Sequence, residues 1–182
     1  MANPFFTIGH STRPIETFTA LLIAAEVKLV VDVRTVPRSR FNPQFNRDAL
    51  PASLTARGIA YEHLAPLGGL RGTQRDIPPE TNAFWENASF HNYADYAMSQ
   101  EFRSGLRTLR EWGETAPACV MCAESLWWRC HRRIITDYLL ADGVTVRHIM
   151  AHDKIEAATL TPGAELRVGG RIAYPAAQGT LI

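Results

Sequence analysis

The stretch Ala118-Cys119-Val120-Met121-Cys122-Ala123-Glu124 decides the fold of this chain, because it is an apolar run that ends in a thiol and a carboxylate. Cys130-His131-Arg132 follows eight residues after Cys122 and opens a predicted helix. Strand-to-helix junctions are where open α/β sheets place ligands, since the loops at the carboxyl ends of the strands diverge into a crevice. The stretch therefore predicts a buried strand, a helix after it, and a site between the two.

Four other short apolar runs alternate with helical patterns. The runs are Phe5–Ile8, Lys28–Arg34, Ile59–His63 and Val144–Ile149. Apolar residues at the spacing of one helix face predict four helices, marked by Phe18 to Ala25, Leu50 and Leu54, Phe102 to Leu109, and Ile134 to Leu139. Strands that alternate with helices imply right-handed βαβ units. We predict one α/β domain over residues 1–182, with a mainly parallel central sheet of about five strands flanked by helices.

Two segments depart from this alternation. Residues 65–89 form a connection much longer than the roughly 2–6 residues that are usual in α/β units, and Phe84 and Trp85 within it favour a packed lid. Beyond the predicted core of residues 5–150, an extension covers residues 151–182. In it, Leu166 to Tyr174 are arranged around Gly169-Gly170, which predicts a small C-terminal hairpin.

Composition bounds the class of protein. The chain has 182 residues, 46% of them hydrophobic, and a net charge of +1, so any basic patch must be local. The N-terminus lacks the layout of a signal peptide, and no apolar run approaches the roughly 20 residues that span a bilayer. Three cysteines are a poor disulfide framework. We expect a cytoplasmic protein with reduced thiols and no membrane contact; composition leaves its oligomeric state open.

Polar side chains follow each of the five predicted strands. They are Gly9-His10-Ser11, Asp32 with Arg34, Gly68-Gly69, Cys122 with Glu124, and His148. Because the carboxyl ends of parallel strands meet at one edge of a sheet, these residues predict a single crevice. We expect Cys122, Glu124, Arg34 and His10 to converge there, whereas His148 on its strand is expected to be structural.

The loop after the second strand predicts an anion site. Arg34, Arg38 and Arg40 crowd into it with Ser39, and Gly68-Gly69 is expected nearby. Guanidinium groups pair bidentately with phosphate and carboxylate, so the cluster favours such a ligand. Two plainer interpretations remain: Asp32 and Arg34 could simply pair with each other, and the arginines could lie in a solvated loop.

The cysteines allow three interpretations. Cys119 and Cys122 have metal-motif spacing, but on a strand this separation places them on opposite faces, so we assign no metal ligands. A zinc site from Cys122, Cys130 and His131 with His10 is less favoured, because the second ligand pair of a zinc motif is missing. The third interpretation is a thiolate favoured by the helix N-terminus and its basic neighbours. Glu124 opposes that field and could instead be the acid or base.

These motifs together resemble the bacterial and archaeal family called domain of unknown function 488. The resemblance runs in order through Thr7 to Ser11, Asp32-Val33-Arg34 with Pro37, Ser39 and Arg40, then Tyr61, Leu67-Gly68-Gly69, Met121 to Glu124, Cys130-His131-Arg132 and Val146 to Ile149. It implies a cytosolic α/β protein and supplies site positions, but no reaction. A weaker likeness to rhodanese sulfurtransferases rests on the Asp-Val-Arg strand and on a strand that ends in Cys122; the small-residue cradle of those enzymes is absent here.

The favoured function is an enzyme that acts on a phosphate-bearing molecule, with a nucleotide or nucleic acid as the first candidate. Cys122, Glu124 and His131 are the predicted catalytic residues. The predicted substrate-binding residues are His10, Ser11, Asp32, Arg34, Arg38, Ser39, Arg40, Gly68, Gly69, Cys130 and Arg132. No cofactor is required by this assignment. The alternatives are a non-catalytic module that senses a small anionic ligand or nucleic acid, and rhodanese-like sulfur transfer through Cys122.

Overall fold

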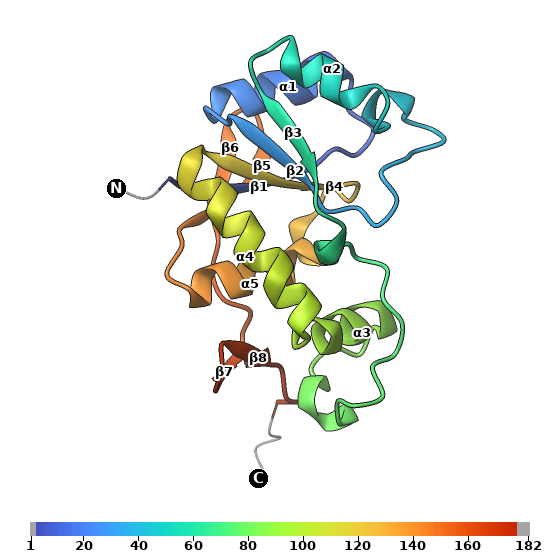
Figure 1. Ribbon diagram of the computed structural model, residues 1–182, viewed down its shortest axis with the longest axis vertical. Coiled ribbons are helices and arrows are strands. Elements are labelled where there is room, and N and C mark those ends of the chain that lie inside the picture. The colour runs from blue at the N-terminus through green and yellow to red at the C-terminus, as the bar shows by residue number, and fades with distance from the viewer. Residues whose placement is uncertain (1–2, 178–182) are drawn as a thin grey trace.

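A six-stranded sheet in the order β3-β2-β4-β1-β5-β6 forms the centre of the computed structural model, which describes residues 3–177 (Figure 1). The strands are β1 (Phe5–Gly9), β2 (Leu29–Asp32), β3 (Ala60–His63), β4 (Ala118–Cys122), β5 (Val146–Ala151) and β6 (Lys154–Ala157). The first five strands run parallel and β6 is antiparallel to β5. The prediction of a mainly parallel α/β sheet is therefore confirmed.

Helices cover both faces of the sheet (Figure 1). They are α1 (Ile15–Ala24), α2 (Leu50–Thr55), α3 (Ala88–Ala97), α4 (Gln100–Thr115) and α5 (Arg132–Ala141), with short 3-10 turns at Pro43–Phe45, Ala65–Leu67, Pro79–Asn82 and Trp127–Arg129. The alternation of side chains along β4 divides the core: Cys119 and Met121 pack with α1 and α2, whereas Val120 and Cys122 pack with α3, α4 and α5.

Two elements were missing from the sequence prediction. Helix α3 has Phe90, Tyr93, Ala94 and Ala97 at the spacing of one helix face, a pattern that the sequence prediction missed. Its start is set by the Asn87 side chain, which accepts from the N–H groups of Ser89 and Phe90. Strand β6 is a short edge strand with mostly exposed residues and lacks the strong alternation by which strands are found in a single sequence.

The C-terminal hairpin is confirmed as β7 (Glu165–Arg167) and β8 (Arg171–Ala173). Gly169 and Gly170 between them both have positive φ, a conformation that glycine adopts without steric cost. Ile172 and Tyr174 are fully buried against the α3, α4 and α5 layer. The extension predicted over residues 151–182 therefore contributes to the core; its residues 178–182, like residues 1 and 2, lie outside the described residues.

The connectivity creates a crevice at the carboxyl edge of the sheet. The β1–α1–β2 crossover and the β4–α5–β5 crossover run in opposite directions along the sheet and over opposite faces. Loops that leave neighbouring strands toward opposite faces separate, and this is where open α/β sheets bind ligands. The ends of β1, β2 and β4 lie side by side at this point.

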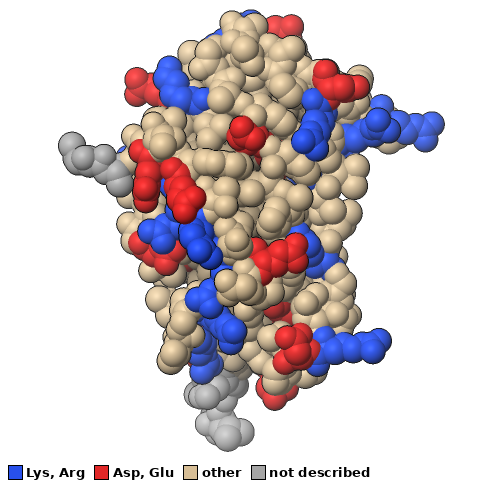
Figure 2. Space-filling model, in the orientation of Figure 1, with Lys and Arg blue, Asp and Glu red and all other residues tan. Residues whose placement is uncertain are grey.

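The face of the molecule drawn in Figure 2 carries charged side chains of both signs. On the face shown in Figure 2, acidic and basic side chains are interspersed, which fits the net charge of +1. Within residues 3–177, none of the helices combines the length and the apolar character needed to cross a membrane.

Candidate functional site

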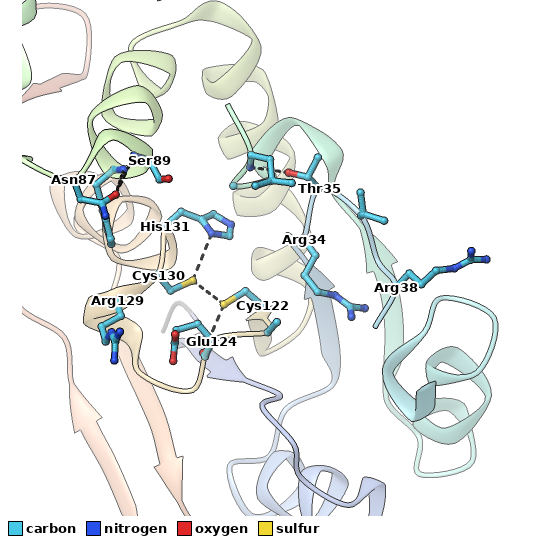
Figure 3. A pocket seen from close by; sticks show the side chains of 15 residues that line it. Arg34, Thr35, Arg38, Asn87, Ser89, Cys122, Glu124, Arg129, Cys130 and His131 are labelled. Carbon is cyan, nitrogen blue, oxygen red and sulfur yellow. Dashed lines mark hydrogen bonds between the residues drawn. The ribbon is translucent and has the colours of Figure 1, made fainter. Parts of the chain in front are cut away.

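A cavity of about 480 Å³ opens at the carboxyl edge, beside the ends of β2 and β4 (Figure 3). This volume lies within the range of roughly 300–1,000 Å³ typical of small-molecule sites. The cavity is lined by Arg34, Thr35, Val36, Arg38, Gly69, Leu70, Asn87, Ser89, Phe90, Cys122, Ala123, Glu124, Arg129, Cys130 and His131. Residues from five separate segments therefore meet around one space.

The floor of the cavity holds two cysteine sulfurs in direct contact. Cys122 ends β4, and Cys130 precedes α5; their Sγ atoms lie 2.7 Å apart (Figure 3). Both residues are buried except where they face the cavity. Sequence spacing suggested that the two motifs would be close, and the fold brings the thiols together.

Arg132 lies beneath both sulfurs and is almost completely buried, with 1% of its surface exposed. Its Nε atom is 3.0 Å from Cys122 Sγ and 3.4 Å from Cys130 Sγ. Its terminal nitrogens donate to Thr7 Oγ1 and to the Glu124 carbonyl oxygen. A buried guanidinium without a carboxylate partner needs another negative charge nearby. The sulfur pair is the group placed to supply it.

Of the two thiols, Cys130 is the one whose surroundings favour the negative charge. Burial opposes ionisation of both thiols, but the hydrogen bond from Cys122 and the charges of His131 and Arg132 hold the pKa of Cys130 well below its ordinary value. The backbone N–H of Arg132, in the first turn of α5, also donates to Cys130 Sγ at 3.4 Å. For Cys122, burial and the bond to Cys130 raise the pKa well above its ordinary value. These contacts and the two pKa directions favour ionisation of Cys130 over ionisation of Cys122.

His131 is oriented by a backbone contact. Its Nε2 atom donates to the Val33 carbonyl oxygen at 2.9 Å, which leaves Nδ1 facing Cys130 Sγ at 3.5 Å. The ring fits because position 69 is glycine: a Cβ atom there would lie 2.5 Å from His131 Nδ1. Gly69 thus acts by permitting close approach of the imidazole to the thiolate.

Glu124 lies at the cavity wall just after β4. Its carboxylate accepts hydrogen bonds from the Leu126 N–H at 3.1 Å and from Ser125 Oγ at 3.3 Å. The backbone at this point is packed against β1, since a Cβ atom on Gly9 would lie 1.8 Å from the Glu124 carbonyl oxygen. A half-exposed carboxylate on a fixed loop beside a thiolate can donate or accept a proton.

Arg34 is held by Asp32. The carboxylate of Asp32, fully buried, accepts from Arg34 Nε at 2.9 Å and from Nη2 at 2.6 Å. Nη2 also donates to the Phe45 carbonyl oxygen, and Nη1 lies 3.2 Å from His10 Nε2. Arg34 touches the cavity, but four of its five N–H groups already have partners in the described residues. The geometry therefore supports the plainer interpretation, in which Asp32 and Arg34 pair with each other.

The cavity therefore gathers some of the predicted residues and leaves others outside its lining. Arg34, Arg38, Gly69, Cys122, Glu124, Cys130 and His131 line it. His10, Asp32 and Arg132 lie behind these residues and contact them. Ser11, Ser39, Arg40 and Gly68 are not part of the lining.

Several lining residues had no counterpart in the sequence prediction. Arg129 immediately precedes Cys130, and this adjacency could have identified it. Asn87, Ser89 and Phe90 come from the start of α3, a helix that the sequence prediction missed. Leu70 follows the predicted Gly69 at the beginning of the long loop predicted as a lid, and it forms part of the wall. Trp85 in the same loop stacks on Phe90 and is buried. Closure of the loop stays a prediction.

The arrangement bears on the alternative chemistries. Cys119 and Cys122 face opposite sides of the sheet, as their spacing predicted. Among residues 3–177, no three His, Cys, Asp or Glu side chains are placed to hold a metal ion. No backbone N–H of the described residues donates to Cys122 Sγ, whereas a persulfide carrier of the rhodanese kind uses a loop of such groups.

Two buried histidines predict a pH-dependent stability. Burial lowers the pKa of both His10 and His148 to about 4, with a further contribution from the charges of Arg34 and Arg132 respectively. In the unfolded chain both return to about 6.5 and bind protons first. The free energy of unfolding should therefore fall as the pH drops from 6.5 to 4, by about 1.4 kcal/mol per pH unit for each histidine.

Urea unfolding across this pH range measures the effect. His148→Gln should reduce the slope, whereas replacement of the exposed His152 by Gln should leave it unchanged. A free energy of unfolding that stays constant over this range would contradict the prediction.

The fold and the site define an α/β protein with a paired-cysteine cavity at the carboxyl edge of its sheet. Residues 14–139 match the family described as domain of unknown function DUF488, and the chain belongs to this family. No curated protein and no solved structure gives a significant match.

Proposed function

We propose that this protein is a thiol-dependent enzyme that acts on a small phosphate-bearing molecule, with a nucleotide as the first candidate. Cys130 is the nucleophile and Glu124 the proton donor or acceptor. His131 stabilises the thiolate in its doubly protonated form, with Nε2–H donated to the Val33 carbonyl oxygen and Nδ1–H directed at the sulfur. The observation that carries the proposal is the position of Cys130 Sγ. It lies in contact with Cys122 Sγ, Arg132 Nε, the Arg132 N–H and His131 Nδ1, and it faces the cavity.

The surroundings of Cys130 are those of a reactive cysteine. The thiolate is the attacking form of cysteine, and it is favoured by a helix N-terminus and by neighbouring arginine and histidine. Cys130 has all three, whereas burial alone holds Cys119 protonated by raising its pKa. The sequence assigned catalysis to Cys122 and binding to Cys130; the contacts favour the reverse assignment for the nucleophile.

The cations of the cavity favour an anionic substrate. Arg38 and Arg129 both line it and are exposed. Within the described chain, neither guanidinium lies within 4.0 Å of a carboxylate. The two side chains lie on opposite sides of the cavity, and the guanidinium of Arg38 extends away from it (Figure 3). Arg38 therefore has to turn inward before it can pair with phosphate oxygens together with Arg129. A working thiolate also requires reduced thiols, which fits a cytoplasmic protein.

A thermal-shift series with inorganic phosphate, mononucleotides and short single-stranded DNA and RNA tests the binding step. A bound ligand should stabilise the fold by about 2.7 kcal/mol at a hundredfold excess over its Kd. Arg38→Ala and Arg129→Ala should weaken this gain. Arg57→Ala is the matched control, because Arg57 is an exposed arginine in the turn before β3, at the amino edge of the sheet. A shift with polymers only, weakening steeply with salt, would indicate a nucleic-acid substrate instead.

Turnover separates an enzyme from a binding module. Wild-type protein incubated with nucleoside phosphates should release inorganic phosphate or a nucleoside, and Cys130→Ser should abolish the release while keeping the thermal shift. Glu124→Gln should lower turnover with binding intact. A ligand that stabilises the wild type but is never turned over would favour the sensing module. The absence of both a shift and turnover would refute the proposal.

A further inference from the structure

We propose that Cys122 and Cys130 are a redox-active dithiol that closes into an intramolecular disulfide when a hydroperoxide enters the cavity. The proposal goes beyond the enzyme activity above and does not depend on it. It starts from the two Sγ atoms, which lie 2.7 Å apart although they come from the end of β4 and the start of α5 (Figure 3).

The geometry meets the two requirements of such a centre. The attacking sulfur must be a thiolate that a small oxidant can reach, and a second thiol must lie close enough to trap the oxidised product. Cys130 is the thiolate, and both sulfurs face the same cavity. Cys122 is the protonated partner in direct contact with it.

The reaction consumes one hydroperoxide and two thiols. The Cys130 thiolate attacks the outer oxygen of ROOH, the O–O bond breaks, and the leaving RO⁻ takes a proton from water to become ROH. Cys130 is then a sulfenic acid. The Cys122 sulfur attacks the Cys130 sulfur, the S–OH bond breaks, and hydroxide leaves with the Cys122 proton as water. The dithiol has lost two electrons to the peroxide, and the product is the Cys122–Cys130 disulfide.

Arg132 should make the Cys122–Cys130 disulfide easy to reduce. It donates to both sulfurs of the reduced pair and is buried with them. A disulfide is neutral, so oxidation takes away the negative charge that Arg132 balances. Stabilisation of the reduced form makes a disulfide a stronger oxidant. We therefore expect a mild dithiol reductant to restore the pair, and the disulfide to protect Cys130 from irreversible oxidation.

Counting thiols tests the proposal without any substrate. Reduced protein is treated with hydrogen peroxide, denatured, and assayed with a thiol reagent. The count should fall from three to one, because Cys119 is fully buried on the other face of the sheet. The chain mass should fall by two hydrogens, peptide mapping should join Cys122 to Cys130, and dithiothreitol should restore all three thiols.

Two variants complete the test. In Cys122→Ser, which keeps a hydrogen-bond donor beside Cys130 but cannot form a disulfide, dimedone should trap the Cys130 sulfenic acid. Without dimedone, this sulfenic acid should proceed to the sulfinic acid, a step that the wild type should resist. Cys119→Ser should behave as the wild type, with a count that falls from two to none. Three free thiols after peroxide treatment of the wild type, or equal sulfinic acid formation in the wild type and Cys122→Ser, would overturn the proposal. Neither result bears on the binding of phosphate, so this failure is distinct from failure of the proposed function.

Discussion

Replacing Arg132 with methionine is expected to slow alkylation of Cys130 by iodoacetamide about tenfold or more at neutral pH. Methionine fills similar space but removes the buried charge that contacts both sulfurs. The pKa of Cys130, now held well below its ordinary value, should rise. Each unit of rise lowers the thiolate fraction about tenfold below the new pKa. Alkylation rates over a pH series, read from the mass of the peptide that contains Cys130, measure the change.

Arg133→Met is the matched control. Arg133 is the next residue of α5, but it lies over the ring of Trp85 and donates to Thr161 Oγ1, away from the sulfurs. Its replacement should leave the pH profile of Cys130 alkylation where it is. If Arg132→Met and the wild type have the same profile, the thiolate is not stabilised by this guanidinium, and the assignment of Cys130 as nucleophile loses its main support.

Replacing Asp32 with alanine is expected to have the largest effect on stability. It removes the carboxylate that accepts from Arg34 Nε and Nη2 and from the Tyr61 hydroxyl. Arg34, 7% exposed, is left as a buried charge without its partner. Breaking a buried ion pair in this way costs about 3–5 kcal/mol. Urea unfolding at constant pH measures the loss.

A double replacement separates the cost of the orphaned charge from that of lost packing. Asp32→Leu combined with Arg34→Met removes both charges, and it should recover much of the loss, because apolar residues can replace a buried ion pair at little cost. The surface control is Asp48→Ala, an exposed acidic position, with an expected change within about 0.5 kcal/mol. A loss for Asp32→Ala no larger than that of Asp48→Ala would show that Arg34 does not depend on Asp32.

The strand framework could be predicted because its signals are local. The apolar runs that became β1, β2, β3, β4 and β5 are readable in short windows, since buried parallel strands need continuous apolar sequence. The same holds for the Gly169-Gly170 turn of the C-terminal hairpin. The prediction missed two elements. Helix α3 has apolar residues at helical spacing, but they follow directly on the long loop, and β6 is a short, mostly exposed strand that pairs only with β5 at the edge of the sheet.

The candidate site was only partly predictable, for a related reason. Parallel strands end at one edge, so Cys122, Glu124 and Arg34 could be placed together because each ends or follows a predicted parallel strand. The role of each arginine could not be predicted in this way. Arg34, Arg38 and Arg132 are chemically identical in the sequence, but their contacts in the fold differ. Arg34 is paired with Asp32, Arg38 lines the cavity without a carboxylate partner among the described residues, and Arg132 contacts the two sulfurs.

By itself, the sequence determined the class of fold, the edge of the sheet at which reactive side chains gather, and the opposite facing of Cys119 and Cys122. Periodicity and the alternation of strands with helices along the chain carry these features, and both can be found in the sequence. Only the tertiary structure decided that Cys122 and Cys130 touch, and that their surroundings favour ionisation of Cys130. Contact between two sulfurs depends on how the loop between β4 and α5 closes. The ionisation of each sulfur depends on burial and on charges brought from elsewhere in the fold, which no local pattern records.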